Sequence, residues 1–386
     1  MRQFKIAHIS KENRFLINTY YQFSKVFYNE CTYFVHKRNS LTKVDYLKKI
    51  HNLIVINETK QDISDLYNEL QMYDIVIFHG LDMFSSQLLL FGDFTPKVVL
   101  FFFGGEIYEN PKIINTLPYG KLTKKEYFKL SNTIPRLRNR LLYNIKYKLN
   151  TLHSLIKKAL TKIDYFGVIH EEDYQFVIDN NIINPETIFF KYSYYPIEFL
   201  YNSETLLNGN NILIGNSRSF SNNHLEAFEL LKQFKLSNRK IIIPFSYGNI
   251  TNYKEIISKG KYYFGSSFYP IFDFLPLNEY NSILSSCSIA IMNHYRQQAV
   301  GNIIALIYSG TKVYLSNKNT FLHYLKRINC VIYSIEDDLI IDNKDAIKPL
   351  NKEQIKHNHK ILYDELGEKK LLSLLKSQIL DILESK

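Results

Sequence analysis

The segment DIVIFHGLDMFSSQLLLFGDFTPKVVLFFFGGE, residues 74–106, indicates the fold class. Two continuous apolar runs, 74–80 and 97–106, flank a segment with helical character at 83–94. A strand that is apolar on both faces is typical of a parallel sheet covered by helices on both sides. The segment therefore predicts a strand–helix–strand unit of a parallel α/β sheet.

The same alternation continues along the rest of the chain. In the first half, further strands are expected at 4–10, 51–57, 163–170 and 187–196. A polar stretch rich in Asn and Gly at 202–211 is a plausible linker. Beyond it the alternation restarts, and one of its expected strands is 262–268.

The length of 386 residues favours two domains rather than one. We predict two Rossmann-like parallel-sheet domains that face a central cleft. Residues 1–200 form the first domain and residues 205–345 the second. Helices at 350–386 are expected to pack back on the first domain.

The excess positive charge is confined to one segment. Residues 121–162 contain twelve Lys or Arg and one acid, which accounts for the whole formal net charge of +11. Apolar residues recur every three or four positions in the same segment, which predicts a basic helix within 121–163. Either this helix has a solvated basic face, or it binds anionic phospholipid, gaining roughly 1 kcal/mol per basic residue. The candidate lipid contacts are Arg136, Arg138, Arg140, Lys146 and Lys148.

Composition excludes several other classes. The three cysteines are far apart and lack the spacing of a metal site, which fits a reduced cytoplasmic protein. No run reaches the roughly 18 apolar residues of a spanning helix, and the first residues do not form a signal peptide. No nucleic-acid-binding motif is present, so nucleic acid is not an expected partner.

Polar residues follow several strands of the second half. Ligands of open parallel sheets bind beyond the carboxyl ends of the strands. A helix N-terminus offers unpaired N–H groups to a phosphate, and glycine there lets the backbone approach closely. The predicted diphosphate-binding residues are Asn216, Ser217, Tyr247, Arg296, Gln297, Gln298, Gly301 and Asn302.

The residues alone leave a second interpretation of this segment open. In it, Gln297 and Gln298 only cap a helix and Arg296 pairs with a nearby carboxylate. The sequence contains neither a Walker lysine motif nor a GxGxxG after the first strand, which weakens kinase and dehydrogenase interpretations.

Two titratable residues close strands of the first half. His79 ends the run 74–80 and Glu106 ends the run 97–106. Either one could act as a general base on a sugar hydroxyl, or could simply bind it. Alternatively, His79 bonds to a loop carbonyl and Glu106 pairs with a neighbouring cation.

The motifs in both halves resemble those of a known family in order and spacing. They are FHG (78–80), FGGEIYE (103–109), ILIGNSRSFSNNH (212–224), IIIPFSYG (241–248) and RQQAVGNIIALIYSGTKVYL (296–315). The family comprises the bacterial TDP-N-acetylfucosamine:lipid II N-acetylfucosaminyltransferases, glycosyltransferase family 56. The resemblance covers roughly residues 74–110 and 205–335.

This resemblance implies a GT-B glycosyltransferase that requires no metal or other cofactor. The expected donor is a nucleotide sugar, with TDP and a fucose-like amino sugar as its parts, held by the second domain. The expected acceptor is a polyprenyl-diphosphate-linked glycan at the inner face of the plasma membrane. The implied role is bacterial surface polysaccharide synthesis, such as that of O-antigen or an enterobacterial common antigen, by a peripheral protein on an anionic membrane.

The sequence departs from the family pattern at four positions. Ala299 replaces an expected glycine and Asn302 replaces a threonine. Phe220 stands in place of a basic residue and Glu106 in place of an aspartate. These changes bear on the identity of the donor sugar more than on the diphosphate site.

Two other functions remain compatible with the sequence. One is a nucleotide-sugar epimerase of GT-B shape, which needs no lipid. The other is a nucleotide-binding subunit without catalytic activity in a polysaccharide assembly complex.

Overall fold

The computed structural model describes residues 4–11, 15–37, 45–110, 112–114, 117–131, 151–200, 207, 209–236, 238–248 and 253–385. These residues form two compact units, which we consider separately. The first unit comprises the described parts of Met1–Thr116, Leu149–Pro196 and Glu368–Lys386. The second comprises the described parts of Leu117–Lys148 and Ile197–Gly367.

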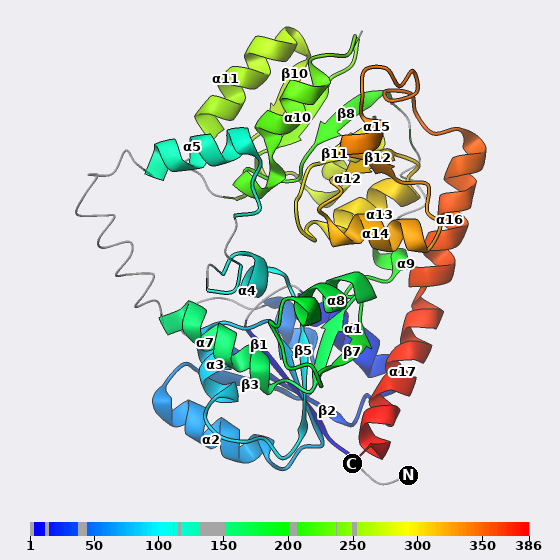
Figure 1. Cartoon of the computed structure of the whole chain (residues 1–386). Coiled ribbons are helices and arrows are strands. Elements are labelled where there is room, and N and C mark those ends of the chain that lie inside the picture. The colour runs from blue at the N-terminus through cyan, green and yellow to red at the C-terminus, as the bar shows by residue number, and fades with distance from the viewer. Residues whose placement is uncertain are drawn as a thin grey trace. The chain divides into compact units, whose positions relative to one another are not determined.

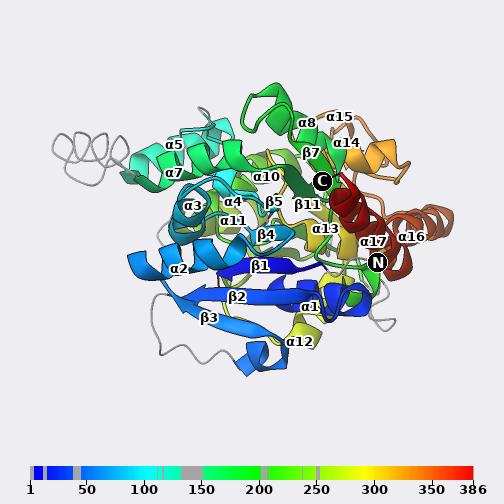
Figure 2. The same ribbon diagram turned by 90° about the horizontal axis from the view of Figure 1, so that it is seen from below.

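The first unit is built on a parallel sheet of seven strands in the order β3-β2-β1-β4-β5-β6-β7, and Figure 2 shows the first of these strands side by side. The strands are β1 (Ile6–Lys11), β2 (Cys31–Lys37), β3 (Leu53–Asn57), β4 (Ile75–His79), β5 (Lys97–Phe101), β6 (Tyr165–Val168) and β7 (Ile188–Lys191). The helices are α1 (Phe15–Val26), α2 (Lys60–Leu70), α3 (Met83–Leu89), α4 (Gly105–Tyr108), α7 (Thr151–Ala159), α8 (Glu171–Asp179) and α17 (Glu368–Glu384).

Both faces of the sheet are buried at its central strands, such as β4 and β5, as the continuous apolar runs predict. Successive side chains of a strand point to opposite faces. In β4, Val76 and Phe78 accordingly pack into one core cluster, while Ile75 and Ile77 pack into another. Helix α17 contributes to the second cluster. Its Gln378 side chain also bonds both the N–H and the C=O of Lys191 in the edge strand β7, at 2.8 and 3.0 Å.

The second unit contains a parallel sheet of six strands in the order β10-β9-β8-β11-β12-β13. Figure 1 labels β8, β10, β11 and β12 of this sheet. The strands are β8 (Asn211–Ile214), β9 (Ile241–Pro244), β10 (Phe268–Ile271), β11 (Cys287–Met292), β12 (Lys312–Leu315) and β13 (Tyr333–Ser334). The helices are α5 (Lys121–Ser131), α9 (Ile197–Leu200), α10 (His224–Leu231), α11 (Tyr253–Phe264), α12 (Leu277–Ser285), α13 (Val300–Tyr308), α14 (Thr320–Arg327), α15 (Ile335–Asp338) and α16 (Lys352–Leu366). All strand pairs are parallel, so both units have the predicted Rossmann-like architecture.

The predicted basic helix at 121–163 is divided between the units. Its first part, α5, belongs to the second unit, where Thr123 donates through its backbone N–H to Glu226 of α10 at 3.0 Å. Its last part, α7, belongs to the first unit and ends at Ala159. The predicted lipid contacts Arg136, Arg138, Arg140, Lys146 and Lys148 lie outside the described residues.

The C-terminal helices are also divided. Helix α16 belongs to the second unit and only α17 belongs to the first. Gly367 separates them in an extended conformation, with φ −62° and ψ 142°.

The expected strand at 262–268 is wrong. Residues 262–264 continue α11, and Gly265 follows it at a φ of +51°, a conformation that glycine adopts readily. Strand β10 begins only at Phe268 and contains Pro270, as an edge strand permits. Aromatic residues with β propensity therefore extend a helix here.

Among the described helices, none combines the length and apolar character needed to cross a bilayer.

Candidate active site

The strand order of the second sheet creates a switch point between β8 and β11. The chain after β8 moves toward β9 on one side, whereas β11 leads to β12 on the other. Open α/β sheets bind ligands in the crevice at such a point, beyond the carboxyl ends of the strands. The loops 215–223 and 293–299, which follow β8 and β11, hold most of the predicted diphosphate residues.

The side-chain amide of Asn216 joins its own loop to the segments that follow β9 and β11. Its Nδ2 donates to the hydroxyl of Tyr247, which follows β9, at 2.5 Å. Its Oδ1 accepts from Nε2 of Gln298, which precedes α13, at 3.3 Å. The structure thus brings three predicted residues from distant parts of the sequence into one hydrogen-bonded set.

His294 supports this set, and the sequence analysis did not identify it. Its Nε2 lies 3.2 Å from Oδ1 of Asn216 and 2.9 Å from Oδ1 of Asn222. Because both partners are acceptors, Nε2 carries the proton. Burial, with smaller contributions from Arg296 and His224, lowers the pKa of His294 to about 3, so the ring is neutral at physiological pH. His294 ties the loop after β11 to the loop after β8.

The loop after β11 leads directly into α13. Arg296 is 7% exposed, and its Nη1 donates to the backbone oxygen of Gln297 at 3.1 Å. Gly301 and Asn302 lie in the first turn of α13, where backbone N–H groups have no partner within the helix. Ala299 precedes the helix with φ 57° and ψ 32°, the left-handed region that explains why glycine is expected there.

Ser217 is placed differently from its neighbours. The residue is 1% exposed, and its hydroxyl accepts from Nδ2 of Asn222 at 3.0 Å and from the backbone N–H of Ser219 at 3.4 Å. The Ser217 side chain therefore shapes the loop after β8 from within.

Gly215 is expected to be essential for this loop. It has φ +66°, and a Cβ atom there would lie 2.5 Å from Oδ1 of Asn222. We expect Gly215→Ala to lower the free energy of unfolding by about 1–3 kcal/mol, through backbone strain and displacement of Asn222. Urea unfolding measures this loss. Gly105→Ala is the control, because a Cβ there meets nothing within 4 Å, and an equal loss in both variants would contradict the prediction.

The first unit contains a cavity of about 380 Å³ at the carboxyl edge of its sheet. It is lined by both predicted catalytic residues, Glu106 and His79, together with Gly80 and the aromatic rings of Phe15 and Phe103. These residues come from the end of β4, from the segment that follows β5 and includes α4, and from the N-terminal end of α1. A concave, partly apolar site with a few polar groups is typical of ligand binding.

Glu106 is suited to proton transfer. It is 7% exposed; its Oε1 accepts from the N–H of Phe103 at 3.3 Å, and its Oε2 has no hydrogen-bond partner among the described residues. Burial raises the pKa of this carboxyl, and the backbone N–H groups around it oppose the shift only in part. A carboxyl with a raised pKa is a stronger base once it is ionised.

His79 lies in the same cavity wall, but both of its ring nitrogens have partners within the protein. Its Nε2 lies 3.1 Å from Nδ1 of His8, and its Nδ1 lies 3.1 Å from the hydroxyl of Tyr194. Burial lowers the pKa of His79 to about 3, so the ring is neutral. With both nitrogens bonded inside the protein, His79 holds the cavity wall rather than presenting a base to it.

Solved structures with the same fold include glycosyltransferases of the GT-B type. Anabaena HepE in complex with UDP-glucose superposes with a TM-score of 0.63 at 10% identity, over 99% of this chain and 100% of that one. A glycosyltransferase from Rickettsia africae gives 0.62 at 14% identity, over 100% of both chains. Sucrose-phosphate synthase from Thermosynechococcus elongatus gives 0.60 at 10% identity, also over 100% of both chains. The fold of this chain is therefore GT-B.

The family is narrower than the fold. Residues 28–369 match the family described as 4-α-L-fucosyltransferase, glycosyl transferase group 56. The chain belongs to this family and is a glycosyltransferase, which confirms the resemblance found in the sequence motifs.

Proposed function

We propose that this enzyme transfers a sugar from a nucleotide diphosphate donor to a hydroxyl group of a glycan acceptor. The observation that carries the proposal is the hydrogen-bonded set of Asn216, Tyr247 and Gln298 at the switch point of the second unit. Arg296 and the first turn of α13 follow in the same loop region. Together these groups offer the donors and positive charge that a diphosphate requires.

The departing nucleotide diphosphate gains negative charge as its bond to the sugar breaks. We assign the stabilisation of this charge to Arg296 and to the N-terminus of α13, which carries about half a positive charge. The two loops at the switch point, 215–223 and 293–299, contain no Asp or Glu. A bound Mg²⁺ usually needs such carboxylates beside the phosphates, so the proposed donor site works without a metal.

The acceptor is assigned to the cavity of the first unit, with Glu106 as the proton acceptor. The acceptor oxygen forms a bond to the anomeric carbon, and its proton moves to the Glu106 carboxylate. The bond between that carbon and the diphosphate breaks, and its electron pair leaves with the nucleotide. His79 keeps the cavity wall in place through His8 and Tyr194.

We also propose the identity of the substrates and a location at the membrane. The family description supports a fucose-like donor sugar, and we propose TDP as its nucleotide and a polyprenyl-diphosphate-linked glycan as its acceptor. We further propose that the chain docks at the cytoplasmic face of an anionic membrane, and the exposed surface of helix α5 supports this proposal. Its exposed lysines, Lys121, Lys125 and Lys129, lie on one side together with Leu122 (37% exposed) and Phe128 (51% exposed).

Vesicle flotation tests the membrane proposal. Replacing Lys121, Lys125 and Lys129 with Gln should weaken binding to phosphatidylglycerol vesicles by roughly 1 kcal/mol per residue. The matched control replaces Lys352, Lys356 and Lys360, which are exposed on α16 at the same spacing. Equal flotation of both variants and the wild type would contradict a role for α5.

A thermal-shift screen against TDP, UDP and GDP tests the donor site. A ligand that binds only the folded protein stabilises it by about 2.7 kcal/mol at a concentration of one hundred times Kd. We expect one nucleoside diphosphate to raise the melting temperature and Arg296→Ala to remove that rise. If no nucleotide changes the melting temperature of the wild type, the proposed donor site is wrong.

A further inference from the structure

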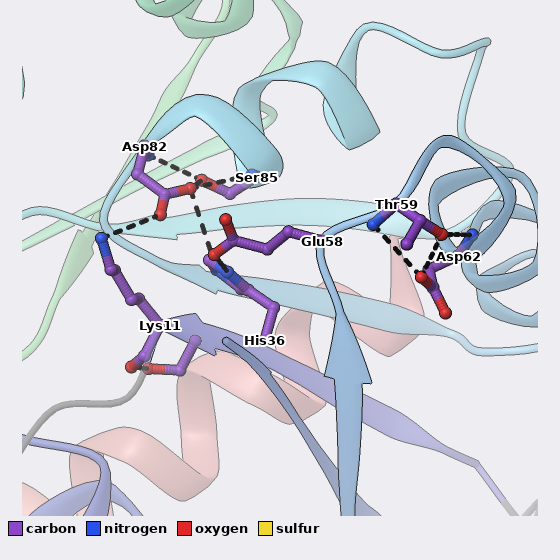
Figure 3. Close-up of polar contacts among 8 residues, drawn as sticks. Lys11, His36, Glu58, Thr59, Asp62, Asp82 and Ser85 are labelled. Atoms are coloured by element: carbon purple, nitrogen blue, oxygen red, sulfur yellow. Dashed lines mark hydrogen bonds and ion pairs between the residues drawn. The ribbon is translucent and has the colours of Figure 1, made fainter. Parts of the chain in front are cut away.

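A polar cluster that the proposed mechanism does not use lines the same cavity of the first unit. Lys11, His36, Asp82 and Ser85 face the cavity, and Glu58 lies beside His36 (Figure 3). We call these five residues the His36 cluster. Four of them lie at or just after the ends of β1, β2, β3 and β4, which is the edge of a parallel sheet that binds ligands, and Ser85 lies in the first turn of α3.

His36 is held in a fixed orientation. Its Nδ1 lies 3.0 Å from Oε1 of Glu58, and its ring stacks on Phe84 at 4.6 Å between centroids. The His36 side chain is 2% exposed. Because the ionised Glu58 carboxylate only accepts hydrogen bonds, Nδ1 is the donor, and in the neutral ring Nε2 then carries a lone pair.

Asp82 lies on the other side of the imidazole. Its Oδ1 accepts from the backbone N–H and the hydroxyl of Ser85 at 3.0 and 2.9 Å and so caps α3. Its Oδ2 is 3.9 Å from Nζ of Lys11. Nε2 of His36 is 3.8 Å from Oδ1, too far for a hydrogen bond. The cluster therefore combines two acceptors, Nε2 and the Asp82 carboxylate, with one donor, Lys11.

The geometry of the cluster does not favour a metal ion. Ligand atoms of His36, Glu58 and Asp82 do lie within 4.8 Å of one another. However, Glu58 is next to Nδ1 and Asp82 is next to Nε2. An ion bound along the lone pair of either nitrogen would have only one of the two carboxylates on its side of the ring. The ammonium group of Lys11 also disfavours a cation beside Asp82.

We propose that the His36 cluster recognises two adjacent hydroxyl groups of a saccharide. One hydroxyl donates to Nε2 of His36, the other donates to Asp82, and Lys11 donates to a sugar oxygen. The rings of Phe15 and Phe103, 4.9 Å apart, line the same cavity and offer apolar surface to the C–H face of a pyranose. This inference rests on the proposed function, which assigns the acceptor to this cavity. It adds that the part of the acceptor bound here is uncharged and rich in hydroxyl groups.

Titration of the full-length chain with methyl hexopyranosides and their monodeoxy analogues, followed by saturation-transfer NMR, tests this proposal. Glycosides with two adjacent free hydroxyls should bind and shift the Nε2 resonance of His36. Removing one of the two recognised hydroxyls should weaken binding at least tenfold, because the buried partner of that hydroxyl would lose its hydrogen bond.

Two variants keep the test independent of folding defects. His36→Phe preserves stacking on Phe84, and Asp82→Asn preserves a residue that caps α3 well. Each should weaken glycoside binding at least tenfold, whereas Asp93→Asn, whose side chain is 94% exposed, should bind as the wild type does.

Several outcomes would overturn the proposal. They are the failure of every glycoside to bind the wild type, wild-type binding by both variants, and Mn²⁺ or Zn²⁺ binding that requires His36, Glu58 and Asp82 together. No nucleotide is present in this experiment, so its result is separate from the thermal-shift test of the donor site. Glycoside binding without nucleotide binding would refute the proposed donor site and leave the hydroxyl subsite standing.

Discussion

Replacing Arg296 with alanine should lower the rate of sugar transfer by about 10²- to 10³-fold, the loss typical of removing one group that stabilises developing negative charge. Arg296 is 7% exposed and precedes the N-terminus of α13. In such a shielded position its interaction with a diphosphate is stronger than in water. Release of nucleoside diphosphate in the presence of donor and membrane-extracted acceptor measures the rate.

Arg327→Ala is the matched control for this experiment. Arg327 is exposed in the last turn of α14, in the same unit. It should retain the wild-type rate. Equal rates for Arg296→Ala and the wild type, with both proteins folded, would remove Arg296 from the proposed site.

Replacing Glu106 with glutamine should reduce kcat by about 10²- to 10⁴-fold, the range expected when a general base is lost. The amide preserves the size of the side chain but cannot take up the acceptor proton. Donor binding should be unchanged, because the proposed donor site is formed by other residues. Glu109→Gln, an exposed change three residues away, should retain activity.

The pH dependence gives a second test of Glu106. Burial raises the pKa of this carboxyl above its usual range, and the base acts only when it is ionised. The rate should therefore fall as pH falls through this raised pKa, at a higher pH than an ordinary glutamate with a pKa of about 4.3 would cause. An acid limb that persists unchanged in Glu106→Gln would assign it to another group.

The apolar runs were sufficient to predict the architecture of both units, but not every strand. Strand β2 was missed, although it lies between β1 and β3 and is largely buried. It contains the polar residues Thr32 and His36, which obscure its apolar character. His36 is tolerated there because Glu58 bonds its ring. This contact joins β2 to the residue that follows β3, and the sequence pattern does not reveal it.

The candidate site, like the fold, could be predicted from the sequence only in part. The placement of polar residues after strands singled out Asn216, Tyr247 and Gln298, and the structure brings these three together because parallel strands have their carboxyl ends at one edge. It did not predict His294, whose role depends on two side-chain oxygens 72 and 78 residues away. The sequence also could not show that both ring nitrogens of His79 have hydrogen-bond partners, His8 and Tyr194.

The most direct measurement of the central claim is a crystal structure of the full-length chain with thymidine or uridine diphosphate. The predicted result is diphosphate density over the N-terminus of α13, within hydrogen-bond distance of Arg296, Gln298 and Asn216. Density at a different place, or its absence at a concentration that saturates binding in solution, would contradict the proposed donor site.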